Sequence, residues 1–186
     1  MKLKIIEQKD DKIKFNINGI NTQLANALRR TIISGIPVLA IERVKFYDNS
    51  SVMGDEVLAH RMGLIPLKTD FASPEKIDLS LEAEGPKTVY SGDLKPDIAV
   101  HGNTPMIKLS ERQKLKLEAE AVIGTARDHI KWQAGLASYS KKDDGSFDFF
   151  VESYGQMPPK DLILTAIKTL GENLDEFKIA IQEQEK

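Results

Sequence analysis

The sequence predicts an α+β fold in which the two ends of the chain share one pattern and the middle follows another. Near each end, a run with apolar residues at every second position precedes a segment with apolar residues three and four positions apart, which is typical of a strand followed by a helix. Most apolar runs in the middle alternate at period two between glycine and proline residues, which indicates antiparallel strands and loops. We therefore expect a discontinuous domain, with an antiparallel sheet and two main helices, around an inserted β-rich domain.

Composition limits the classes of function. Hydrophobic residues make up 41% and charged residues 29% of the 186 residues, as in ordinary soluble proteins. With a formal net charge of −2, the chain lacks the overall basic character of a stand-alone nucleic-acid-binding protein. The absence of cysteine excludes disulfides, thiolate zinc sites and cysteine-ligated iron–sulfur clusters. No apolar run approaches the roughly 20 residues of a membrane helix, so we expect a cytoplasmic protein with no membrane contact and no cofactor.

The chain begins with a predicted β-hairpin and helix. Apolar residues alternate in two runs, Leu3 and Ile5, then Ile13, Phe15 and Ile17. The turn between these runs falls at Asp10 and Asp11. Either Asn21 or Thr22 can cap a helix over residues 22 to about 34. A strand rich in β-branched and aromatic residues is expected next, from Val38 to about Tyr47.

The first helix combines an apolar stripe with two arginines. Its stripe consists of Leu24, Leu28 and Ile32. Arg29 and Arg30 point about 100° apart on a helix, so one can border the stripe while the other projects outward. Two adjacent arginines can bind a carboxylate-rich surface of a partner. More often, such a pair simply lies on a helix face that is exposed to solvent.

The middle of the chain predicts a short helix and several strands. Asp55 can cap a helix that runs to Met62 and closes at Gly63. Alternating apolar residues then indicate strands near positions 77–81, 89–90 and 115–123. The one tryptophan, Trp132, lies in a loop-like stretch, where it either anchors an interface or packs against the protein itself.

The chain ends with a strand and a long helix. The strand begins at Phe147, and Pro158-Pro159 opens the helix. Apolar residues of the helix step alternately by four and three positions: Ile163, Ile167, Leu170, Leu174, Phe177 and Ile181. Leu162 and Ala166 add a second apolar side, which we expect to face the protein's own sheet. The stripe can therefore be intramolecular core or a contact with another subunit, and the pattern leaves both open.

No catalytic constellation is present in the sequence. His60, His101 and His129 lack a second ligand at metal-binding spacing. The adjacent acidic pairs at 55–56 and 143–144 are explained as a helix cap and a solvated turn. There is no phosphate-binding glycine loop and no nucleophile elbow. We therefore expect no catalytic residues and no metal site.

Two long motifs carry a resemblance to a known family. Residues 26–37 (NALRRTIISGIP) and 55–67 (DEVLAHRMGLIPL) resemble its two signatures, and residues 129–133 (HIKWQ) and 149–155 (FFVESYG) fit further on. The family is that of the bacterial RNA polymerase α amino-terminal domain, and the form is similar to its archaeal D-type members in DNA-directed RNA polymerase. Many archaeal D-type members carry a cysteine-rich segment before the last strand; the cysteine-free gap from Ala134 to Phe147 resembles the short form without an iron–sulfur cluster.

The resemblance implies a scaffold for transcription. It predicts a dimerisation domain made of residues 1–47 and 147–186 and an inserted domain over 48–146. It also implies a non-catalytic subunit of a nucleotidyltransferase complex, which heterodimerises with the small L subunit and docks the large catalytic subunits and small assembly subunits, meeting DNA only indirectly. The residues expected at the dimer interface are Leu24, Leu28, Ile32, Ile163, Ile167, Leu170 and Leu174. The residues expected to dock the large subunits are Arg29, Arg30, His60 and Arg61.

Other family members and other classes of protein would have different features. A small L-type partner lacks the inserted domain. A bacterial α subunit homodimerises and carries a linked DNA-binding carboxyl-terminal domain, for which we expect no room after Lys186. This homodimeric scaffold is the alternative to the D-type heterodimer. Outside the family, a small hydrolase needs a clustered nucleophile and base, and a nucleic-acid-binding module needs affinity that falls steeply with salt.

Overall fold

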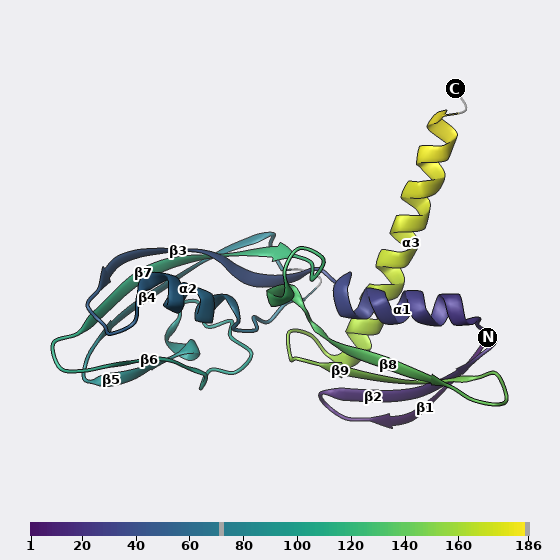
Figure 1. The fold of residues 1–186 in the computed structure, drawn as a ribbon, viewed down its shortest axis with the longest axis horizontal. Coiled ribbons are helices and arrows are strands. Elements are labelled where there is room, and N and C mark those ends of the chain that lie inside the picture. Colours follow the sequence, from purple (N-terminus) through teal and green to yellow (C-terminus); the bar gives the residue numbers. More distant parts are fainter. Residues whose placement is uncertain (71–72, 185–186) are drawn as a thin grey trace. The chain divides into compact units, whose positions relative to one another are not determined.

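The computed structural model describes residues 1–70 and 73–184 and confirms the predicted α+β class. The chain divides into two compact units. Unit 1 is discontinuous and comprises Met1–Ile36, Thr125–Arg127 and Gln133–Lys186. Unit 2 comprises Pro37–Gly124 and Asp128–Trp132. Figure 1 labels the helices and strands of both units.

The unit boundaries differ from the predicted boundaries at residues 47 and 147. Strand β3 (Val38–Asn49) belongs to unit 2, because it pairs along its whole length with β7 (Lys114–Gly124). Strand β8 (Gly135–Lys141) belongs to unit 1, because it pairs with β9 (Phe147–Ser153). Strand β8 was not predicted, since a short edge strand with serine, glycine and lysine shows little alternation of apolar residues.

Unit 1 is one antiparallel sheet packed against two helices. The strand order is β1-β2-β9-β8, with β1 at Lys2–Gln8 and β2 at Lys12–Asn18. Helix α1 (Thr22–Ser34) packs over β8, and α3 (Pro159–Gln184) packs over β9 and β2. The α1 bounds are those predicted from the sequence. Of the two candidate caps, Asn21 is the one used, because its side-chain oxygen accepts a hydrogen bond from the Leu24 N–H at 2.9 Å.

The core of unit 1 is built on the helix-facing side of this sheet. Phe15 and Phe149 lie opposite each other on neighbouring strands, and their rings stack with centroids 5.1 Å apart and an angle of 3° between their planes. Tyr139 on β8 packs against the second of these rings at 5.3 Å. Leu162 and Ala166 of α3 are fully buried, so the second apolar side of the helix faces the core of unit 1 as expected.

The hairpin of β1 and β2, at the edge of unit 1, contains a carboxylate that is paired with two lysines. The ammonium groups of Lys14 and Lys9 lie 2.7 and 2.8 Å from the Glu7 carboxylate and lower its pKa from 4.5 to about 2. A carboxyl with a depressed pKa stabilises the folded hairpin above pH 4.5, and this contribution is lost as the pH falls from 4.5 to about 2.

Lys14→Met is therefore expected to raise the Glu7 pKa toward 4.5, because Lys14 is the main cause of the shift. A nuclear magnetic resonance titration of the Glu7 carboxyl carbon measures this pKa directly. Lys4→Met is the matched control on the same hairpin and leaves the titration unchanged. An unaltered Glu7 pKa in Lys14→Met would contradict the ion pair.

Unit 2 consists of two antiparallel sheets and one α-helix. The larger sheet has the order β3-β7-β4, and the smaller pairs β5 with β6. The remaining elements are β4 (Lys76–Glu84), β5 (Lys87–Tyr90), β6 (Pro105–Leu109), α2 (Asp55–Gly63) and the short 3-10 helices at Ser91–Asp93 and Ile130–Trp132. Leu58 and Met62, on the inner side of α2, are buried in the core of unit 2.

Trp132 packs inside unit 2. Its indole N–H donates to the Val122 carbonyl at 3.1 Å, and the ring is almost fully buried. The ring covers Gly124 so closely that a Cβ there would lie 2.4 Å from it. Of the two interpretations left open by the sequence, packing against the protein itself is therefore the one observed.

Candidate interaction surfaces

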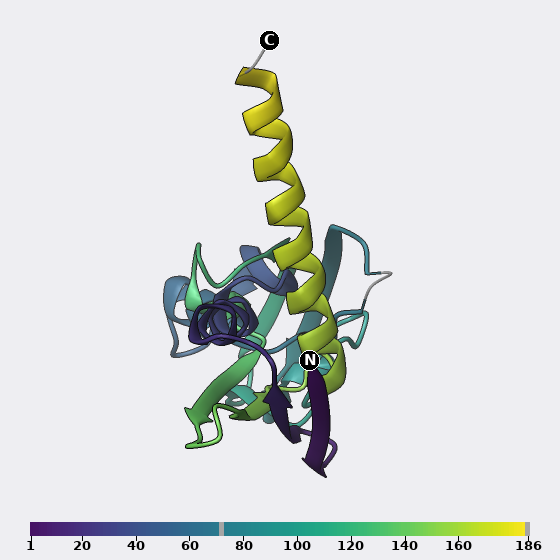
Figure 2. The same ribbon diagram turned by 90° about the vertical axis from the view of Figure 1, so that its right-hand side faces the viewer.

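The distal part of α3 extends from unit 1 with all of its residues exposed. Every residue over 171–184 is exposed, and Figures 1 and 2 show these turns rising away from the sheet and from α1. The predicted apolar stripe continues into this part: Ile167, one turn before it, is 53% exposed, and Leu174 and Phe177 within it are 68% and 65% exposed. Isolated helices of this length are marginal in water, and exposed apolar stripes mark contacts with other molecules. The stripe on α3 therefore fits a surface that another chain covers.

The structure separates the other predicted interface residues into exposed and buried ones. Ile163 and Leu170 are half-buried on α3, and Leu24 on α1 is exposed. Leu28 and Ile32 are instead buried within unit 1, because their side of α1 packs on the unit's own sheet. The expectation that these two side chains form a contact surface is therefore not supported by their positions.

Further exposed apolar residues were missed from the sequence. Leu3 and Ile5 on β1 are 57% and 50% exposed, and Leu164 on α3 is exposed as well. The alternation in the first strand predicted only that Leu3 and Ile5 belong to a β-hairpin. Both lie with Ile163 and Leu164 around one groove at the edge of the sheet. The structure thus brings part of the predicted stripe together with apolar residues of the first strand.

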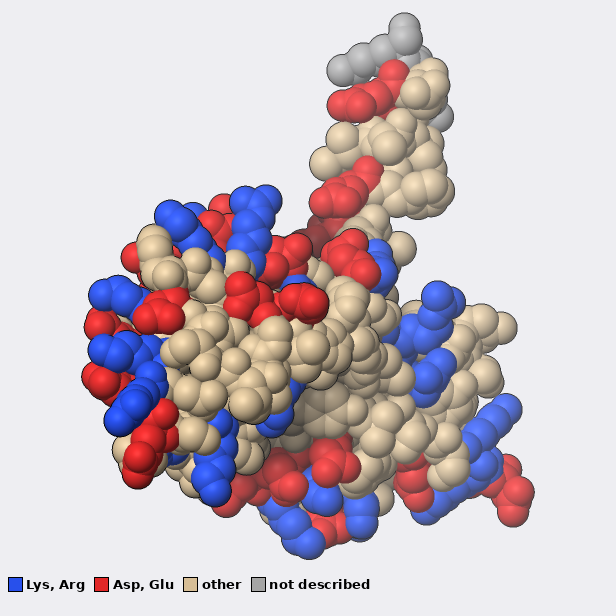
Figure 3. Space-filling model, turned by 60° about the vertical axis from the view of Figure 1, so that its left-hand side comes forward, with Lys and Arg blue, Asp and Glu red and all other residues tan. Residues whose placement is uncertain are grey.

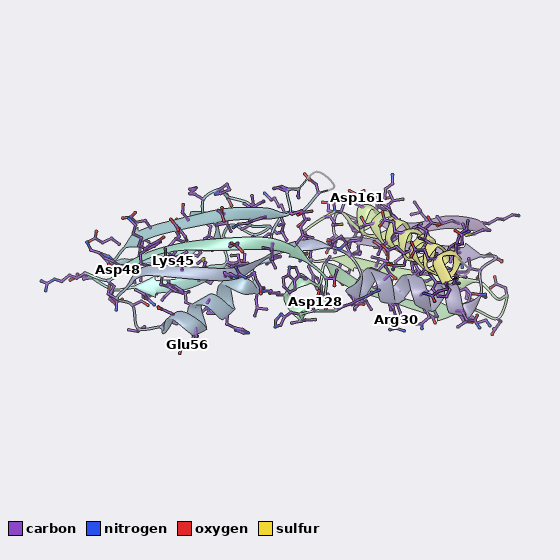
Figure 4. All side chains as sticks on the ribbon, turned by 90° about the horizontal axis from the view of Figure 1, so that it is seen from above. Arg30, Lys45, Asp48, Glu56, Asp128 and Asp161 are labelled. Atoms are coloured by element: carbon purple, nitrogen blue, oxygen red, sulfur yellow. The ribbon has the colours of Figure 1, made fainter. Side chains whose placement is uncertain are left out.

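The two arginines of α1 have different environments. The Arg29 guanidinium is half-buried and donates from Nη2 to the Asn26 side-chain oxygen at 3.0 Å. Arg30 is exposed and projects from α1 in Figure 4. The sequence placed one arginine beside the apolar stripe and one outward. Arg30 is therefore the more exposed arginine of the pair.

The predicted docking residues of unit 2 lie on the outer side of α2. Arg61 donates to the Pro105 carbonyl at 2.9 Å and so ties α2 to β6. His60 is exposed and lines a shallow groove with Glu42, His129 and Lys131. The Lys131 ammonium is paired with the Glu42 carboxylate in that groove.

Two kinds of site are absent from the part of the chain that the structure describes. There, no group of three or more histidine, aspartate and glutamate residues is arranged to hold a metal ion. None of the helices in the same described part is long and apolar enough to cross a membrane.

Comparison with known proteins identifies the family. Residues 14–174 match the model of the RNA polymerase Rpb3/Rpb11 dimerisation domain. The chain is 44% identical over 156 residues to DNA-directed RNA polymerase subunit Rpo3 of Methanocaldococcus jannaschii, with 82% of each chain covered. It is 35% identical over 240 aligned positions to Rpo3 of Halobacterium salinarum, with 97% of each chain covered.

A third relative is longer than this chain. Identity to Rpo3 of Pyrococcus furiosus is 45% over 152 residues, covering 75% of this chain and 58% of that relative, so the match spans less than two thirds of its length. The predicted resemblance to RNA polymerase subunits is confirmed at the level of the family. With a family match over most of its length and an exposed apolar helix, the chain belongs to the RNA polymerase Rpb3/Rpb11 dimerisation domain family.

Proposed function

We propose that this chain is a non-catalytic assembly subunit of a DNA-directed RNA polymerase, of the archaeal D type. In this role unit 1 heterodimerises with a small L-type subunit, and the pair docks the large catalytic subunits. The observation that carries the proposal is the exposed apolar stripe on α3 in a chain of the dimerisation family. In this role the chain acts in the cytoplasm, needs no cofactor and contacts DNA only indirectly, within the assembled enzyme.

Burial of the stripe supplies the free energy for pairing. Covering Ile167, Leu174 and Phe177 stabilises the complex by about 1.5–3 kcal/mol for each fully buried side chain. Part of this gain offsets the entropy lost when two chains associate. The distal helix is also held in place by the partner, which stabilises turns that have no other packing in the described residues.

Size-exclusion chromatography with light scattering tests the proposal on the chain alone and on the chain co-expressed with small L-type subunits. The expected result is a one-to-one heterodimer. A homodimer that ignores such partners would favour the alternative, a scaffold resembling bacterial α. A well-behaved monomer in every mixture would overturn the assembly role altogether.

Arg30→Ala is expected to weaken capture of the large subunit while the small heterodimer forms normally. An exposed guanidinium suits a carboxylate-rich surface, and charge-assisted hydrogen bonds contribute about 1.5–3 kcal/mol. The expected loss in capture is therefore roughly tenfold or more. Pull-down of the large subunit by the preformed heterodimer measures it.

Two further variants sharpen this test. Arg29→Ala is expected to have a smaller effect, because its guanidinium is already bonded to Asn26. Arg43→Ala, on the charged sheet face of unit 2, is the control and leaves capture unchanged. Equal capture by Arg30→Ala and the wild type would show that Arg30 is ordinary surface. For His60 and Arg61 we propose docking of the same machinery, with Arg61 also holding β6.

A further inference from the structure

We propose that the groove beside α2 in unit 2 receives one apolar side chain, with a carboxylate next to it, from a loop of the large subunit. This inference rests on the proposed function, because His60, which lines the groove, is one of the residues proposed to dock that subunit. The lining residues all belong to unit 2 and come from β3, from the last turn of α2 and from the segment around the 3-10 helix Ile130–Trp132. They are Ile41, Glu42, Ala59, His60, Gly63, Leu64, His129 and Lys131.

The size and the floor of the groove suit a single apolar side chain. Its volume is about 230 Å³, below the roughly 300–1,000 Å³ of pockets that hold cofactors and other small molecules. Its uncharged lining consists of Ile41, Ala59, Gly63 and Leu64. A Cβ at Gly63 would lie 3.5 Å from the Ile41 carbonyl oxygen and 3.9 Å from the Lys131 side chain. The glycine therefore leaves room between these groups for a side chain from another molecule.

Lys131 fixes one wall of the groove. Its ammonium pairs with the Glu42 carboxylate and donates to the Ile41 carbonyl oxygen at 3.1 Å. The same ammonium lies 4.3 Å from the centre of the buried Trp132 ring. These contacts hold the wall in place within unit 2 before any partner arrives. A wall that is already ordered reduces the entropy lost on binding.

The polar rim favours a carboxylate on the occupant. Glu42 supplies the carboxylate among the described lining residues, and its charge is already paired with Lys131. Nδ1 of His129 accepts a hydrogen bond from the Lys131 backbone N–H at 3.1 Å, which leaves the proton of the neutral ring on Nε2. That Nε2–H belongs to an exposed side chain, and the exposed His60 adds a second imidazole to the rim. An incoming carboxylate can therefore accept a hydrogen bond at this rim.

The surroundings of the groove agree with a local anchor. Leu64 is 50% exposed, and Ile130, between the lining residues His129 and Lys131, is 62% exposed. Charge over the wider surface is mixed, since Figure 3 shows basic and acidic side chains interspersed with uncharged ones on the face turned toward the viewer. Recognition therefore depends on the groups at the groove. An apolar anchor within a polar rim is the usual arrangement of a hot spot in a protein interface.

Leu64→Asp is expected to lower capture of the large subunit by the preformed heterodimer tenfold or more. The substitution removes apolar surface from the groove and adds a carboxylate that repels the one expected on the occupant. Val57→Asp is the matched control, because Val57 is 51% exposed on α2 and is not among the residues that line the groove. Its capture is expected to stay near that of the wild type.

Site-directed cross-linking identifies the occupant directly, since the chain contains no cysteine. Ile130→Cys carries a benzophenone maleimide in the assembled complex, and mass spectrometry maps the product. The expected cross-link lies in a large-subunit loop that has an apolar residue next to an aspartate or glutamate. Val52→Cys, 86% exposed before α2, is the control and does not label that loop. Cross-links only to a small subunit or to a second copy of this chain would overturn the proposal.

The groove assignment and the proposed function fail in different ways. Wild-type capture by Leu64→Asp, with circular dichroism unchanged, would remove the groove assignment and leave the assembly role intact. A wild-type heterodimer that captures no large subunit would instead remove the proposed function itself.

Discussion

Ile167→Asp is expected to lower the affinity for the small partner at least 100-fold without unfolding the chain. Ile167 is 53% exposed, so an aspartate is hydrated at this position in the free protein. In the complex, the same carboxylate would be unpaired in an apolar contact, which costs several kcal/mol. A loss of about 3 kcal/mol corresponds to roughly a 100-fold fall in affinity. Titration calorimetry or analytical ultracentrifugation of the purified chains measures it.

Lys168→Asp is the matched control for this substitution. It places the same side chain in the same turn of α3, about 100° around the helix from the stripe. Its ion pair with Glu172 is exposed and contributes little to stability. We expect Lys168→Asp to pair normally and Leu174→Asp to behave like Ile167→Asp. Heterodimer formation by both stripe variants at wild-type affinity would remove α3 from the interface.

Leu28→Asp is a poor test of pairing, although the sequence pattern suggests it. Leu28 is buried in unit 1, so a carboxylate there destabilises the fold whether or not a partner is present. Loss of the heterodimer in that variant would not distinguish a broken interface from an unfolded chain. The exposed positions on α3 avoid this ambiguity.

Phe149→Ala is expected to destabilise unit 1 by about 3–5 kcal/mol, the usual cost of removing a buried phenylalanine side chain. The ring is 2% exposed, stacks on Phe15 and contacts Tyr139, so truncation leaves a cavity that these rings cannot fill without moving. Urea denaturation followed by circular dichroism measures the loss. Because Trp132 lies in unit 2, unchanged tryptophan emission without urea would show that unit 2 keeps its packing.

Phe150→Ala provides the comparison within the same strand. Phe150 is only half-buried and lies on the opposite face of β9, so its truncation removes less apolar contact. We expect a cost well below that of Phe149→Ala. Equal destabilisation by the two variants would contradict the assignment of the core to the helix-covered face of the sheet.

Local signals in the sequence account for the elements that were predicted well. The α1 bounds follow from a capping asparagine at one end and Gly35 with Pro37 at the other, all within a few residues of the helix. The long strands are likewise marked by sustained alternation. Helix α2 begins at Asp55 as expected, but the predicted cap is wrong, because the N-cap residue is Gly54 and the Asp55 carboxylate accepts from the Asn49 side chain at 2.6 Å instead. Strands β6 and β8 were missed because they are short, and their pairing partners decide whether they form strands at all.

The candidate surfaces also include features that the local sequence pattern predicted and features that it did not. The heptad-like spacing on α3 identified the stripe from the sequence, since the spacing depends only on the helical period. The stripe on α1 looked similar, yet Leu28 and Ile32 face the unit's own sheet. The alternation in β1 predicted a strand, but only the structure shows that Leu3 and Ile5 lie exposed at an edge where the helix layer ends.

The sequence by itself determined the fold class, most of the helices and strands, the absence of cysteine chemistry and the family motifs. These properties depend on neighbouring residues and on residue type. Only the tertiary structure decided the unit boundaries, which of the two arginines is exposed and which apolar residues stay uncovered within unit 1. Those properties depend on what packs against each face, and burial against distant strands and helices is not recorded in the local pattern of one segment.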